Sequence, residues 1–104
     1  MAPFTALADP TRLRIVEMLA RGERSAGEIH RAFDASASAI SQHLKVLREA
    51  RLVQVRAEAQ RRVYSLDPDG LDEIDAWVGR VRRFWNVKLD ALERGLHAER
   101  KRKG

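Results

Sequence analysis

The chain has 104 residues, 44% of them hydrophobic and 34% charged, a balance that predicts one small globular domain and excludes a disordered chain. It contains no cysteine, which excludes disulfide bonds, thiolate metal sites and cysteine nucleophiles, and it has no apolar run long enough to span a membrane. The net charge of +5 is unevenly distributed, because residues 36–66 hold six Lys and Arg against two Asp and Glu, and such a basic patch is typical of polyanion-binding proteins.

The first predicted helix covers residues 10–21. Asp9 can accept hydrogen bonds from the free N–H groups of the first turn, and Pro10, which has no N–H group, suits the first helical position. Hydrophobic residues cover most of the helix surface, so we expect it to be largely buried. Gly22 ends it.

The next two predicted helices are short and closely spaced. Ser25 is the expected N-cap of the first, and Glu28 three residues later completes the pattern of a capping box. Ser36 is the expected N-cap of the second, which covers residues 36–50. Two short amphipathic helices joined by a few residues form a helix-turn-helix.

The helix over residues 36–50 has two contrasting faces. Ile40, Leu44 and Leu47 recur at helical spacing and predict a buried stripe. A solvated opposite face would more often carry Glu and Lys in pairs four residues apart. The opposite face instead carries short polar side chains and then cations, namely Ser38, Ser41, Gln42, Lys45 and Arg48.

After residue 50 the hydrophobic period changes from helical to alternating. Residues 52–58 and 61–66 predict the two strands of a hairpin with its tip near residues 58–60. The tip contains no Gly, Asn or Asp, so the sequence does not identify the turn type. Because an isolated hairpin is unstable in water, it must pack on the helices, and the combination is a winged helix-turn-helix.

Asp67 and Pro68 repeat the cap-plus-proline pattern and predict a long helix to about residue 98. Two adjoining hydrophobic stripes run along it, and together they exceed what one small core can hide. We therefore expect a homodimer around a two-fold axis; the alternative is a wider intramolecular core. Residues 1–98 are the expected single DNA-binding and dimerisation domain, and residues 99–104 are an expected basic, disordered tail.

Three segments carry a resemblance to a known family. The opening LADPTRLRIVEMLARGERSAGEI, the helix SASAISQHLKVLREARLV and the segment RRVYSLDP resemble the ArsR/SmtB family of small bacterial winged-helix repressors. The resemblance implies homodimers that bind palindromic operators, with the first and last helices at the dimer interface. Together with the stripes of the last helix, this places the interface at Phe4, Leu7, Ile74, Trp77, Val78, Val81, Phe84, Trp85, Leu89 and Leu92.

The same resemblance argues against metal sensing. Metal-sensing branches of the family carry cysteines near the position of Ser25, or His and acidic ligands along the last helix. Here no cysteine exists, and the last helix has only His97, far from its acidic start. The segment RFWNVKLDALERGL resembles a cysteine-free subgroup, so we expect no metal site and no cofactor.

The predicted DNA contacts lie on the second helix of the helix-turn-helix and on the hairpin. Gln42 can bond an adenine edge and Ser can bond bases or phosphates, while Ala39 keeps the helix surface low enough for close approach. His43 lies between the two faces, so contact with DNA and packing against a neighbouring helix both stay open. The full predicted set is Ser38, Ala39, Ser41, Gln42, His43, Lys45 and Arg48, with Arg56, Arg61 and Arg62 on the hairpin for the DNA backbone.

Other functions receive less support from the sequence. The three histidines are scattered, and no nucleophile elbow, HExxH motif or Gly-rich phosphate loop is present, so we expect no enzyme. The sequence predicts a cytoplasmic repressor whose partners are double-stranded DNA and a second copy, with no membrane partner. The alternatives are a winged-helix protein–protein module and a metal-responsive repressor with non-cysteine ligands. The sequence identifies neither the operator nor an inducer.

Overall fold

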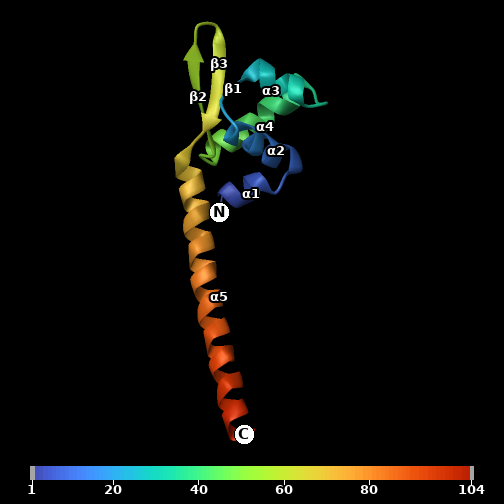
Figure 1. The fold of residues 1–104 in the computed structure, drawn as a ribbon. Coiled ribbons are helices and arrows are strands. Elements are labelled where there is room, and N and C mark those ends of the chain that lie inside the picture. The colour runs from blue at the N-terminus through green and yellow to red at the C-terminus, as the bar shows by residue number, and fades with distance from the viewer. Residues whose placement is uncertain (1, 104) are drawn as a thin grey trace. The chain divides into compact units, whose positions relative to one another are not determined.

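The computed structural model describes the backbone of residues 2–103 and the side chains of residues 2–97 (Figure 1). The chain divides into two compact units, one ending at Ile74 and the other beginning at Asp75. A mainly helical chain with a small antiparallel sheet confirms the predicted fold class. Its elements in chain order are α1 (Ala2–Leu7), α2 (Pro10–Ala20), β1 (Arg24–Ser25), α3 (Ala26–Ala32), α4 (Ala37–Glu49), β2 (Val53–Glu58), β3 (Arg61–Leu66) and α5 (Pro68–Lys103).

Three helices begin at the N-caps that the sequence predicts. The Asp9 carboxylate accepts hydrogen bonds from the backbone N–H groups two and three residues later, at 2.8 and 3.1 Å. The Ser25 hydroxyl accepts from the N–H of Glu28, and the Glu28 carboxylate accepts from the N–H of Ser25, so the predicted capping box is present. Ser36 caps α4 in the same way, at 3.1 Å. These caps satisfy N–H groups that have no partner inside the helix.

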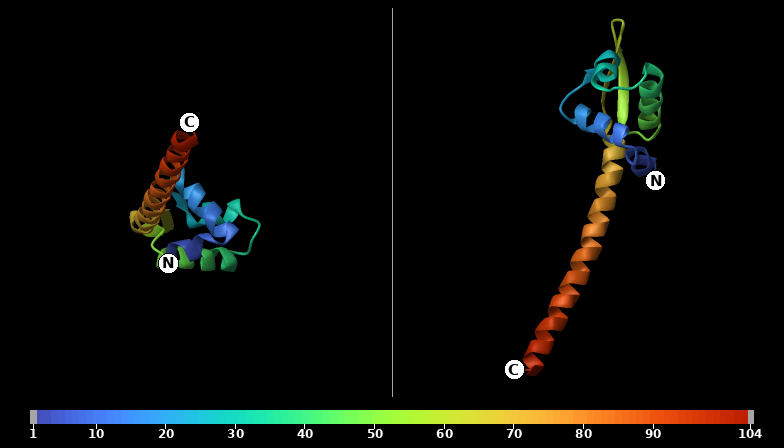
Figure 2. Two further views of the ribbon diagram at one scale, coloured as in Figure 1. Left: turned by 90° about the horizontal axis from the view of Figure 1, so that it is seen from below. Right: turned by 90° about the vertical axis from the view of Figure 1, so that its right-hand side faces the viewer.

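The core of residues 1–74 lies where α2, α3, α4 and the sheet meet. Helix α4 packs against α1, α2, α3 and β2, and Figure 2 shows it alongside α2. The predicted stripe of α4 faces this core. Burial of α2 is less complete than its hydrophobic surface predicts, because Leu13 remains 40% exposed. Side chains that are fully buried include Ile15, Ile29, Ile40, Leu47 and Leu52.

The sheet has three antiparallel strands in the order β1-β3-β2. Strands β2 and β3 are the predicted hairpin. Strand β1 is an addition that the sequence does not predict, because two residues are too few to show an alternating pattern. It pairs Arg24 with Tyr64 and Ser25 with Val63, which makes β3 the central strand.

The turn of the hairpin consists of two residues, Ala59 and Gln60, because Glu58 pairs with Arg61 directly across it. Ala59 has a φ of 55°, in the left-handed region that favours glycine. A positive φ at the first of two turn residues is the pattern of a type II′ turn. An alanine gives no sequence signal for that turn, which is why the tip is not predictable.

A close backbone contact joins the end of α4 to the start of α5. Arg51, between α4 and β2, has a φ of 58°, and its carbonyl accepts a hydrogen bond of 2.8 Å from the N–H of Gly70. A Cβ atom on Gly70 would lie 2.4 Å from that carbonyl oxygen, so only glycine fits there. The N–H of Asp67 donates to the carbonyl of Leu52 at 2.9 Å and closes the same corner.

Helix α5 begins at Pro68, as predicted, and its backbone is helical to Lys103, beyond the expected end near residue 98. The side chains of residues 98–103 lie outside the described residues, so the basic tail over 99–104 stays a prediction. Leu71 and Ile74 pack against the core. From there to residue 97, α5 exposes a series of large hydrophobic side chains, Trp77, Val81, Phe84, Trp85, Val87, Leu89, Leu92 and Leu96.

Candidate nucleic-acid interface

The polar face of α4 is exposed, while the opposite stripe of the helix is buried. The hydroxyl-bearing residues come in the first half of the helix and the cations in the second half. Ala39, at the edge of this face, is half-buried and adds no bulk to it. The structure therefore brings six of the predicted contact residues onto one accessible helix surface, Ser38, Ala39, Ser41, Gln42, Lys45 and Arg48.

His43 differs from these residues, because it is half-buried at the flank of α4 and contacts α2. Its Nδ1 lies 3.3 Å from Nη1 of Arg12. Arg12 also donates from Nε to the carbonyl of Ala6 in α1, at 2.7 Å. His43 therefore makes the packing contact that the sequence leaves open, and its contact with DNA stays a prediction.

Arg56 on β2 is engaged within the protein. Its guanidinium forms ion pairs with Glu23, which precedes β1, and with Glu58 on its own strand, the latter at 2.8 Å. The hydrogen bond from Arg56 lowers the pKa of the Glu23 carboxyl below its ordinary value, and the two carboxylates raise the pKa of Arg56. The hairpin of β2 and β3 is the wing of the winged helix. Two anions offset the charge of Arg56, so this residue brings the wing no net positive charge.

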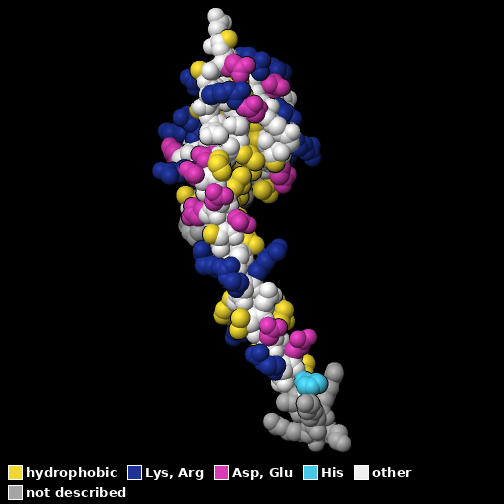
Figure 3. Space-filling model, turned by 60° about the vertical axis from the view of Figure 1, so that its left-hand side comes forward, with side chains coloured by type: hydrophobic (Ala, Val, Ile, Leu, Met, Phe, Trp, Pro, Cys, Tyr) yellow, Lys and Arg dark blue, Asp and Glu magenta, His cyan; other side chains and the backbone are white. Residues whose placement is uncertain are grey.

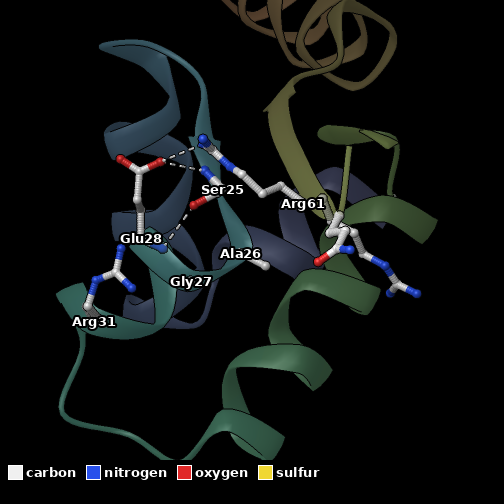
Figure 4. A pocket seen from close by; sticks show the side chains of 8 residues that line it. Ser25, Ala26, Gly27, Glu28, Arg31 and Arg61 are labelled. Carbon is white, nitrogen blue, oxygen red and sulfur yellow. Dashed lines mark hydrogen bonds and ion pairs between the residues drawn. The ribbon is translucent and has the colours of Figure 1, made fainter. Parts of the chain in front are cut away.

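The other two wing arginines differ from each other. Arg61 lies 3.5 Å from a carboxylate oxygen of Glu28, the residue that completes the capping box (Figure 4). Both groups border an open pocket of about 790 Å³ between the start of α3 and the wing, which Arg31 also lines. Arg62 is exposed and forms no ion pair within residues 2–97. Of the three, Arg62 is the cation most available to an external anion.

Known proteins resemble this chain both in sequence and in fold. The family profile described as "Bacterial regulatory protein, arsR family" matches residues 9–55. The HTH-type transcriptional regulator Rv2034 of Mycobacterium tuberculosis is 46% identical over 96 residues, which cover 92% of this chain and 87% of that protein. The chain belongs to the ArsR family. As a member of that family it is a DNA-binding transcriptional regulator and not an enzyme.

Two further comparisons agree with this ArsR assignment. The transcriptional repressor SdpR of Bacillus subtilis is 35% identical over 75 residues, covering 72% of this chain and 83% of that protein. The structure of an ArsR-like transcriptional regulator from Rhodococcus sp. RHA1 superposes with a TM-score of 0.75 at 27% identity, covering 89% of this chain and 88% of that chain. The winged-helix fold expected from the sequence is the fold of that solved ArsR-like structure.

Most of the dimer interface predicted for this ArsR protein lies on α5. Trp77, Val81 and several later hydrophobic residues of α5 are exposed. Figure 3 shows groups of hydrophobic side chains at the surface, with charged side chains between them. Lys88, which interrupts the hydrophobic spacing, lies with its ammonium 5.4 Å from the centre of the Phe84 ring. Ile74 and Val78 are half-buried, as are Phe4 and Leu7 of α1. Their contact with a second copy stays a prediction.

Two features of this ArsR chain bear on metal binding and on membranes. Within the side chains that the structure describes, no three His, Asp or Glu residues are grouped so that they could hold a metal ion. Over the described part of the chain, none of the helices combines the length and the hydrophobicity needed to cross a membrane.

Sequence reasoning missed two residues that shape this ArsR interface. Glu23 neutralises Arg56, but the pairing depends on the short strand β1, which leaves no pattern in the sequence. Arg12 contacts α1 and α4 through its side chain, whereas the sequence places it only in a largely hydrophobic helix. Glu23 and Arg56 are 33 residues apart, and Arg12 and His43 are 31 residues apart, so only the fold reveals these contacts.

Proposed function

We propose that this ArsR-family regulator is a cytoplasmic homodimeric repressor that inserts α4 into the major groove of a palindromic operator. The observation that carries the proposal is the exposed face of α4, whose short polar side chains allow the close approach that base recognition requires. Gln42 is suited to a bidentate contact with adenine, and Ser38 and Ser41 to bases or nearby phosphates.

The cations on the rim of this surface serve a different purpose. Lys45 and Arg48 follow the serines along α4 and would reach phosphates beside the groove. On the wing, Arg62 is the main candidate for a backbone contact, since Arg56 and Arg61 already face carboxylates. Phosphate contacts strengthen binding without selecting a sequence.

The partner of the exposed α5 surface is a second copy of the chain, packed in the antiparallel direction. Antiparallel helices that cross near residue 87 place Val81 opposite Leu92 and bring Arg82 close to Glu93. Parallel helices would place the arginines of residues 80–83 of both copies at the same level, where they repel. The charge pattern of α5 therefore favours the antiparallel pair.

Selection of bound fragments from a random DNA pool tests the proposal most directly. A homodimer predicts an enriched inverted repeat, with half-sites about one helical turn apart. A control variant with Gln42 and Ser41 both changed to Ala should lose the enriched sequence but retain weak binding at low salt. Equal recovery of all fragments by the unmodified protein would contradict operator recognition, and enrichment of a single half-site would contradict the dimer.

A further inference from the structure

Arg12 occupies a junction of three helices. It belongs to α2, its Nε donates to the carbonyl of Ala6 in α1 at 2.7 Å, and its Nη1 lies 3.3 Å from Nδ1 of His43 in α4. Its own backbone N–H is held by the Asp9 cap, at 3.1 Å. The residue is half-buried, and its guanidinium lies between these elements. One side chain thus joins α1 to the helix that carries the DNA-facing residues.

The chemistry of this contact defines the state of the His43 ring. A guanidinium has only N–H donors and stays protonated, so the contact is a hydrogen bond only when Nδ1 of His43 accepts. An imidazole that accepts at Nδ1 carries its hydrogen on Nε2 and is neutral. Arg12 therefore selects one tautomer of the ring.

We infer that Arg12 is a positioning residue for DNA binding. It fixes His43 as a neutral donor, with its Nε2–H group available to an oxygen of the DNA, and it ties the orientation of α4 to α1. The inference rests on the proposed function, because it assigns a role to the flank of α4 that faces the operator. Arg12 itself makes no contact with DNA.

The first test replaces Arg12 with Lys, which keeps the positive charge but cannot serve two acceptors with a planar fork. The matched control is Arg21→Lys, because Arg21 is the exposed C-cap residue of the same helix. Operator affinity should fall about tenfold for Arg12→Lys, the effect of removing one charge-assisted hydrogen bond. It should stay within about twofold for the control. The salt dependence of binding should be unchanged in both variants.

A direct phosphate contact by Arg12 would give the opposite result. In that case Arg12→Lys would bind nearly as well as the unmodified protein, because Lys also binds phosphate as a point charge. Arg12→Gln would then reduce the salt slope, which is the steepness with which log affinity falls as log salt concentration rises. Either outcome would overturn the positioning role.

The second test measures the tautomer without any DNA. In a ¹⁵N-labelled protein at neutral pH, His43 should show the Nε2–H form, and Arg12→Lys should shift it toward a mixture of tautomers. His30 and His97 are the other two histidines of the chain and serve as internal references. An Nδ1–H form or a charged ring at His43 in the unmodified protein would overturn the inference.

Two variants of His43 separate its two nitrogen atoms. His43→Asn keeps an acceptor near the position of Nδ1 but removes the Nε2 donor, so it should fold normally and bind the operator about tenfold more weakly. Adding Arg12→Lys to it should cause little further loss of affinity, because the two residues act through one contact. Additive losses would overturn the inference. If the unmodified protein selects no DNA sequence, the proposed function fails, while the tautomer experiment still tests the Arg12–His43 contact.

Discussion

Gln42 occupies the exposed face of α4 between the serines and the first cation, where a side chain of its reach meets base edges. Gln42→Ala should therefore cost about 1–3 kcal/mol of operator binding, and the loss should be confined to one base pair in each half-site. Titrations against operators changed at single positions measure this. An equal loss at every operator variant would place Gln42 outside the groove.

The wing arginines predict two different salt dependences. Arg62→Ala should weaken binding equally for all sequences and reduce the salt slope by about one for each phosphate that Arg62 no longer neutralises. Arg56→Ala should leave the slope nearly unchanged, since Glu23 and Glu58 already offset its charge. Binding isotherms at several salt concentrations distinguish them. A reduced slope in Arg56→Ala would show that its ion pairs open on DNA.

Helices α2 and α3 each have a carboxylate, Asp9 or Glu28, in their N-terminal capping hydrogen bonds, which makes these helix starts sensitive to acid. The N-cap hydrogen bonds from Arg12 and Thr11 lower the pKa of Asp9, and those from Ser25 lower the pKa of Glu28. A lowered folded-state pKa stabilises the fold above the unfolded pKa, and this contribution is lost as the pH falls through the folded value.

Unfolding midpoints in urea should therefore decline as the pH drops below about 4, where both carboxyls begin to protonate in the unfolded chain. Asp9→Asn keeps a capping oxygen that does not titrate, so its midpoint should decline less over the same pH range. An identical decline in both proteins would show that the Asp9 cap does not contribute.

The corner between α4 and α5 brings the backbones of Arg51 and Gly70 into close contact. Gly70→Ala should destabilise the fold by about 2 kcal/mol, because its Cβ would overlap the carbonyl of Arg51. Gly95→Ala is the matched control, since a Cβ there meets nothing within 4 Å. Arg51→Gly should stabilise by about 0.5 kcal/mol by relieving the positive φ. Thermal unfolding of the three variants checks both signs.

The sequence predicts those elements whose physical signal is local. Caps such as Asp9 and Ser25 and the stripe of α4 mark their helices, because the determining contacts lie within one or two turns. The exposed face of α4 follows from the same periodicity. Strand β1 and the ion pair of Glu23 with Arg56 depend on segments that meet only after folding, so no local pattern indicates them.

At the scale of the whole molecule, we predict that two copies associate through their α5 helices and that these helices run antiparallel. Because the chain lacks cysteine, single cysteines can report this without background. Val81→Cys and Leu92→Cys should each stay uncrosslinked alone, since residue 81 of one copy would lie about 16 Å along the axis from residue 81 of the other. An oxidised mixture of the two should form a disulfide-linked heterodimer, visible on a non-reducing gel. A disulfide in either variant alone would instead indicate parallel helices.

The paired state of Arg56 also bears on how quickly the regulator finds its target. Within the described residues, Arg62 of the wing has no ion pair while Arg56 and Arg61 each have at least one, so attraction to arbitrary DNA is weaker than the count of cations implies. Encounters with non-operator DNA should therefore be brief, and the protein should spend less of its search time bound to such sites.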